Sequence, residues 1–141
     1  MILETKNIFL NQKPMEKEDV IRKIGEIFSS QGYTNEYYTQ AMLDKEKVFN
    51  TYIGNELAIP HGIEDAKKHI KKTGLVLVTV PEGQDWGASE KVKVIIGIAA
   101  VGDEHLCVLQ KIAMCFSDKA GVEKLLTLNE QEISDLFEGE E

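Results

Sequence analysis

The sequence predicts an α/β fold, a three-layer α/β/α sandwich with a mixed sheet at its centre. Two stretches, residues 75–80 and 92–100, are almost uninterrupted in Val, Leu, Ile and Ala, so both faces of these strands must be covered. Segments with helical periodicity lie before and after them. A hairpin signal at Gly54-Asn55 adds an antiparallel part to the sheet. With 141 residues, 43% of them hydrophobic, the chain is expected to form one domain over residues 1–141.

Three elements are predicted in the first third of the chain. Residues 2–10 have the composition of a first strand, which a turn over residues 11–14 ends. A helix begins at Glu16, because apolar residues recur there at spacings of three and four, and Gly32 ends it. A second helix is predicted over residues 35–47.

The middle of the chain is predicted to be extended. A short strand over residues 48–53 turns at Gly54-Asn55 into a second strand over residues 57–59, and a short helix over residues 63–68 follows. The two buried strands come next.

The C-terminal part is predicted to be helical. Asp103 is a suitable N-cap for a strong helix, and two shorter helices follow, one over residues 117–126 and one from Asn129, which forms a capping-box pair with Glu132. The stripe expected to face the sheet from the first of these helices consists of Leu106, Leu109, Ile112, Ala113 and Phe116.

Composition excludes several classes of protein. The net charge of −8 disfavours a nucleic-acid binder, which normally carries a basic face. No run of residues is long and apolar enough to span a bilayer, and no signal-peptide pattern opens the chain. Cys107 and Cys115 lie eight residues apart on one predicted helix, about 12 Å along its axis, which is too far for a disulfide. They are expected to be ordinary buried thiols in a cytoplasmic protein.

One histidine stands in an unusual local setting. His61 follows Pro60, which ends an extended segment, and precedes Gly62, which permits a sharp turn. The short helix behind it would present backbone N–H groups that attract anions. A neutral imidazole is a competent nucleophile toward phosphorus. This combination favours phosphoryl transfer through His61.

A second histidine lies in a comparable position. His105 falls in the first turn of a predicted helix after a buried strand, and ligands gather where strands end and helices begin. The two imidazoles are predicted to face one shallow pocket. His69 belongs to a basic run read as a solvated face, and no third residue joins His61 and His69 as a metal ligand. The sequence contains no nucleotide-binding loop and predicts no cofactor.

The string from Gly54 to Gly62, GNELAIPHG, resembles the phosphorylation motif of the mannitol/fructose class of phosphotransferase-system IIA domains. The resemblance covers roughly residues 7–137. It continues through three further stretches, AMLDKE at residues 41–46, VPEG at residues 80–83 and GDEHL at residues 102–106. Within this class the mannitol-type domains are the most similar.

The resemblance implies a cytoplasmic phosphocarrier. His61 would accept a phosphoryl group on Nε2 from the phosphohistidine of HPr and pass it to a cysteine of a IIB domain of a mannitol-type permease, so that the sugar is phosphorylated during uptake. His105 matches the supporting histidine of the family. Lys45 stands where mannitol-type domains often have arginine, and lysine keeps the charge without the bidentate fork. Either Lys45 contacts phosphate, or it forms a surface ion pair with a nearby Glu.

Two alternatives remain open at this point. One is a nitrogen-type regulatory IIA module, in which the phosphorylation state of His61 controls the binding of other proteins. The other is an interaction domain that is not phosphorylated at all.

Overall fold

A five-stranded mixed sheet forms the centre of the fold, and the structure, a computed structural model, describes residues 2–138 of the chain. The order of the strands across the sheet is β1-β4-β5-β3-β2. The pairs β1–β4 and β3–β5 are parallel, and the pairs β4–β5 and β2–β3 are antiparallel. The strands are β1 (Ile8–Phe9), β2 (Tyr52–Gly54), β3 (Leu57–Ala58), β4 (Gly74–Gln84) and β5 (Val92–Ala99).

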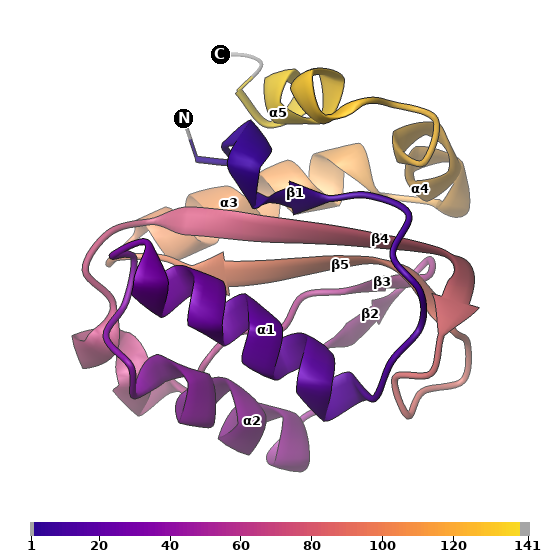
Figure 1. Cartoon of the computed structure of the whole chain (residues 1–141). Helices are drawn as coiled ribbons and strands as arrows, with labels where there is room; N and C mark the ends of the chain where they lie inside the picture. Colours follow the sequence, from indigo (N-terminus) through magenta and orange to yellow (C-terminus); the bar gives the residue numbers. More distant parts are fainter. Residues whose placement is uncertain (1, 139–141) are drawn as a thin grey trace.

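Helices cover both faces of this sheet (Figure 1). One face packs against α1 and α2, and the other against α3, α4 and α5, so that two separate apolar clusters lie on either side of the strands. The predicted three-layer α/β/α sandwich is confirmed. The α-helices are α1 (Lys17–Ser30), α2 (Tyr38–Val48), α3 (Glu104–Cys115), α4 (Lys119–Leu125) and α5 (Glu130–Glu138), and the 3-10 helices are η1 (Thr5–Asn7) and η2 (Glu64–His69).

Most helix signals in the sequence are confirmed. Gly32, just beyond α1, has a φ of 82°, which an L side chain rarely adopts. The capping box at α5 forms in both directions: Asn129 N–H donates to Glu132 Oε1 at 2.9 Å, and Glu132 N–H donates to Asn129 Oδ1 at 2.8 Å. Asp103 occupies the N-cap position of α3 but makes no capping hydrogen bond through its side chain.

The predictions at the edges of the sheet were less accurate. Only Ile8 and Phe9 of the predicted strand over residues 2–10 pair with β4, and η1 precedes them. The strand predicted over residues 48–53 was placed too early, because α2 extends to Val48 and β2 begins at Tyr52. The hairpin turn is centred on Asn55 and Glu56, both with positive φ, one residue later than predicted.

The packing face of α3 also differs from the prediction. Val108 and Ile112 are its buried residues, whereas Leu106 is 61% exposed and Cys107 is exposed. Cys115 is half-buried. The prediction of two buried thiols was therefore wrong for Cys107. Because α3 carries apolar residues around much of its circumference, its periodicity alone does not define one face.

No helix within residues 2–138 is long and apolar enough to cross a membrane.

The close approach of α1 to β5 gives a test of the packing. A Cβ added to Gly97 would lie 2.4 Å from Ile24 Cγ2, far inside van der Waals contact. We expect Gly97→Ala to lower the free energy of unfolding by about 1–3 kcal/mol, because the strand and the helix must separate to admit the methyl group. Chemical denaturation measures this, with Glu26→Ala on the exposed face of α1 as the control. A Gly97→Ala protein as stable as the wild type would contradict the packing described here.

Candidate functional site

His61 lies just beyond the end of β3, in a segment held on both sides by hydrogen bonds. Ile59 N–H donates to the Thr51 carbonyl at 3.0 Å, and the Pro60 carbonyl accepts from Ile98 N–H at 3.0 Å. Gly62 N–H donates to the Tyr38 hydroxyl at 2.9 Å. The backbone around the imidazole is thus tied to the residue that precedes β2, to β5 and to α2, and these elements determine its position.

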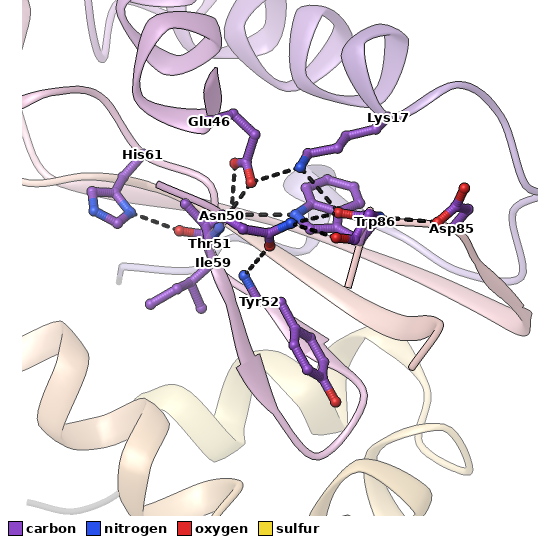
Figure 2. A network of polar contacts seen from close by, with 10 residues as sticks. Lys17, Glu46, Asn50, Thr51, Tyr52, Ile59, His61, Asp85 and Trp86 are labelled. Carbon is purple, nitrogen blue, oxygen red and sulfur yellow. Dashed lines mark hydrogen bonds and ion pairs between the residues drawn. The ribbon is translucent and has the colours of Figure 1, made fainter. Parts of the chain in front are cut away.

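The ring of His61 is fixed by its own backbone. Its Nδ1 lies 2.7 Å from the carbonyl oxygen of Ile59 (Figure 2). A carbonyl oxygen only accepts hydrogen bonds, so Nδ1 carries the proton and donates it. The other ring nitrogen, Nε2, therefore keeps its lone pair in the neutral ring. Nε2 is thereby the ring nitrogen that remains available as a nucleophile.

His105 lies beside His61, as predicted. It stands in the first turn of α3 and is half-buried, and the centroids of the two imidazoles are 5.4 Å apart with an angle of 55° between the rings. This separation leaves the rings tilted toward each other without stacking. Two residues 44 positions apart in the sequence are thus brought to one place by the ends of β3 and β5.

The two histidines line a small pocket of about 100 Å³ with Lys45, Lys67 and Glu64. Lys67 Nζ pairs with a Glu64 carboxylate oxygen at 3.0 Å. One alternative for Lys45 was a surface ion pair with a nearby Glu. Among the ion pairs of residues 2–138 there is none with Lys45, and its Nζ lies 4.9 Å from the centroid of the Phe49 ring. All three predicted site residues, His61, His105 and Lys45, therefore meet at one pocket that carries two cationic side chains.

Burial keeps both imidazoles neutral. It lowers the pKa of His61 below its usual value, and the nearby charge of Lys45 lowers this pKa further. The Ile59 carbonyl and the negative charge of Glu46 partly oppose both effects. Burial likewise lowers the pKa of His105. The positive charges of Lys67 and Lys45, and that of His61 whenever its ring is protonated, lower this pKa further, and the Glu64 carboxylate opposes them. At pH 7 each ring is therefore in the form that has one lone pair and one N–H donor.

Tyr38 is a residue of the site that the sequence did not reveal. Its hydroxyl accepts from Gly62 N–H and donates to the Ile98 carbonyl at 2.9 Å, and burial raises the pKa of the phenol to about 12. A Cβ on Gly62 would lie 2.6 Å from this ring. Gly62 is thus required by the close approach of Tyr38, and not by the positive φ that a sharp turn would need. In the sequence Tyr38 is indistinguishable from a core tyrosine.

Lys67 was also missed, because the sequence assigned it to a solvated basic run. The signal that could have identified it is its position in the segment directly after His61. That segment is the six-residue 3-10 helix η2, and the amide of Gly62 is already bound to Tyr38. Cationic side chains, more than helix amides, therefore provide the positive charge at the pocket.

The remaining candidates lie elsewhere. His69 Nδ1 accepts a hydrogen bond from the Asn35 side-chain amide at 2.9 Å, and its ring lies against the Tyr37 ring, with centroids 5.6 Å apart. Within residues 2–138 no group of three or more His, Cys, Asp or Glu side chains is placed to hold a metal ion.

Comparison with known sequences gives a family and close relatives. Residues 1–139 match the family described as "Phosphoenolpyruvate-dependent sugar phosphotransferase system, EIIA 2". The mannitol-specific phosphotransferase enzyme IIA component of Staphylococcus aureus is 42% identical over 133 residues, which cover 94% of this chain and 92% of that protein. The component of the same name from Bacillus subtilis is 36% identical, over 93% of this chain and 92% of its own length.

Solved structures agree with this. The crystal structure of IIA mannitol from Escherichia coli has a TM-score of 0.85 and 38% identity, with 97% of this chain and 99% of that chain covered. The E. coli IIAMtl chain in a complex with phosphorylated IIBMtl has a TM-score of 0.88 and 36% identity, with 98% and 99% covered. On the family match over residues 1–139 and these relatives, the chain belongs to the EIIA 2 family of the phosphoenolpyruvate-dependent sugar phosphotransferase system.

Proposed function

We propose that residues 1–141 form one IIA phosphocarrier of a mannitol-type phosphotransferase system, in which His61 carries the phosphoryl group. The observation that carries this proposal is the bond from His61 Nδ1–H to the Ile59 carbonyl, which leaves Nε2 as the nucleophile beside two cationic side chains. The names of the relatives, which are mannitol-specific IIA components, support the choice of sugar.

The chemistry is a pair of in-line displacements at phosphorus. The Nε2 lone pair attacks the phosphoryl group of a donor phosphohistidine, a new N–P bond forms, and the old N–P bond breaks with its electron pair returning to the donor ring. A cysteine thiolate of the acceptor then attacks the phosphorus, so that an S–P bond forms and the His61 N–P bond breaks. The proton on Nδ1 stays hydrogen-bonded to Ile59 throughout, and neither step requires a proton transfer at His61.

The pocket supplies positioning and charge for these steps. Phosphoryl transfer passes through a loose transition state with negative charge spread over the equatorial oxygens. Lys45 and Lys67 provide positive charge, and neutral His105 can donate its N–H to one of these oxygens. In this proposal Lys45 acts as a point charge on the phosphate, since lysine lacks the planar fork of arginine.

HPr is the proposed donor and a IIB domain of a mannitol-type permease is the proposed acceptor, both in the cytoplasm. A IIA–IIB pair is described for the E. coli neighbour. Apolar residues beside the pocket favour protein partners: Leu106, next to His105, is 61% exposed, and Val101, next to Ala100 of the pocket, is 42% exposed. A phosphoryl group on a partner can reach a pocket flanked in this way.

Reconstitution tests the function directly. The chain is incubated with phosphoenolpyruvate, enzyme I and HPr, and then with IIB proteins of several sugar systems. We expect labelling of the chain and transfer to a mannitol-type IIB cysteine. Labelling without transfer to any IIB would favour a nitrogen-type regulatory module instead, and an unlabelled chain would eliminate both phosphocarrier functions.

His61→Gln is expected to abolish labelling, because the nucleophilic nitrogen is lost. His69→Gln is the matched control, since His69 contacts Asn35 and Tyr37 outside the pocket, and it should be labelled as the wild type is. Mass spectrometry of the intact protein measures both. A labelled His61→Gln protein would assign the phosphoryl group to another residue.

His105→Ala is expected still to be labelled, but the rate of labelling should fall by roughly tenfold or more. The reason is that the substitution removes one hydrogen-bond donor to the equatorial oxygens of the phosphoryl group. Rapid-quench measurement of transfer from phospho-HPr gives the rate. An unchanged rate would remove His105 from the mechanism.

Lys45→Met is expected to raise the pKa of His61, because a nearby positive charge that disfavours the imidazolium is removed. Protonated His61 cannot attack phosphorus, so the acid limb of the labelling rate moves to higher pH. Only part of the pKa shift reverses, since burial, its largest cause, remains. NMR titration of the His61 ring measures the pKa, with Lys68→Met as the control, and a pKa that stays constant or falls would contradict this account.

A further inference from the structure

A largely buried ion pair lies close to Thr51, the residue that binds the His61 segment. Lys17, the first residue of α1, places its Nζ 2.9 Å from Glu46 Oε2 on α2, and their side chains are only 16% and 6% exposed. Figure 2 shows both side chains converging beside Thr51 and Trp86. Such a pair is expensive to bury and is seldom a net gain in stability over apolar residues of the same volume. Its presence therefore calls for a reason beyond packing.

The Glu46 carboxylate holds one residue, Thr51, at two points. It accepts from Thr51 N–H at 2.8 Å and from the Thr51 hydroxyl at 2.7 Å. The same hydroxyl accepts from Trp86 Nε1–H at 3.3 Å, and Thr51 and Trp86 are 2% and 0% exposed. The two oxygens of one carboxylate thus fix both the backbone and the side chain of Thr51, which no apolar residue could do.

Two further hydrogen bonds lead from Thr51 to the reactive ring. The Thr51 carbonyl accepts from Ile59 N–H at 3.0 Å, and the Ile59 carbonyl accepts from His61 Nδ1–H at 2.7 Å (Figure 2). The peptide between Thr51 and Tyr52 is also held on its other side, where Tyr52 N–H donates to Asn50 Oδ1 at 2.8 Å. The Ile59 carbonyl, which orients the His61 ring, is therefore positioned by Thr51, and Thr51 is held by the Glu46 carboxylate.

We propose that Glu46 is a positioning residue for phosphoryl transfer: by clamping Thr51 it sets the Ile59 carbonyl where that oxygen fixes the His61 ring with Nε2 free. The inference rests on the proposed function of His61. In this arrangement Lys17 neutralises the buried carboxylate, while the clamp on Thr51 belongs to Glu46 alone. Glu46 touches no phosphate. It acts through the ring orientation, and separately its negative charge raises the pKa of His61, which is why the tautomer is read out beside the rate.

The test separates positioning from stability by breaking the same ion pair from either end. Lys17→Met removes the pair and the bond from Lys17 Nζ to the Trp86 carbonyl but leaves both bonds from Glu46 to Thr51. Glu46→Ala removes the pair and the clamp together. Both substitutions are expected to lower the midpoint of thermal unfolding, so measurements are made well below it. Two properties of the folded protein are then compared: the tautomer of His61, from its ring 15N chemical shifts, and the limiting rate and apparent KM of phosphoryl acceptance from phospho-HPr.

Glu46→Ala is expected to lower the limiting rate on the order of tenfold with little change in KM, because misplacement of the nucleophile affects the reaction more than docking. The Nδ1–H tautomer should lose its dominance at the same time. Glu46→Gln, whose amide oxygen can still accept from Thr51 N–H, should fall between Glu46→Ala and the wild type. Lys17→Met should keep the wild-type tautomer and limiting rate.

Equal rates and tautomers in Glu46→Ala, Lys17→Met and the wild type would overturn the inference and leave Glu46 with a structural role only. If Glu46→Ala does not fold, Glu46→Gln, which keeps the volume, decides by the same two readouts. A wild-type chain that accepts no phosphoryl group would refute the proposed function, while the tautomer comparison would still test the positioning by Glu46.

Discussion

The hydrogen bond from His61 Nδ1 to the Ile59 carbonyl is the contact on which the chemistry proposed for this chain depends. It ties the side chain to the backbone two residues earlier, so the ring orientation is set by where the strand β3 ends. It also decides which nitrogen keeps a lone pair in the neutral ring. Hydrogen bonds to Thr51 and Ile98 fix Ile59 and Pro60, and they thereby also fix the position of the His61 ring.

The fold was predictable from the sequence where patterning was strong. Continuous apolar runs identified β4 and β5, and the periodicity of α1 and the capping box of α5 located those helices. The prediction errors lie where the local sequence pattern does not determine which residues pair or pack. The N-terminal segment has strand composition, yet only Ile8 and Phe9 pair with β4, because pairing depends on a partner distant in sequence. On α3 an excess of apolar residues concealed which face packs.

The sequence singled out His61, His105 and Lys45, which line one pocket in the structure, but not the residues that hold the His61 segment in place. His61 was identified by its setting between proline and glycine, and His105 by its position at the start of a helix. In the structure the centroids of their rings are 5.4 Å apart. Tyr38 and Glu46 could not be found in this way. A tyrosine on an inward stripe and a glutamate in the last turn of an α-helix look ordinary in sequence. Their roles come from contacts with Gly62, Ile98 and Thr51, which only the folded chain creates.

The most direct measurement is to determine which ring nitrogen of His61 carries the phosphoryl group. NMR of the phosphorylated protein labelled with 15N-histidine distinguishes the two nitrogens through their coupling to phosphorus and to the ring protons. The orientation imposed by Ile59 predicts phosphorus on Nε2 and a proton retained on Nδ1. Phosphorus on Nδ1 would contradict the account, because that nitrogen could not then donate to the Ile59 carbonyl.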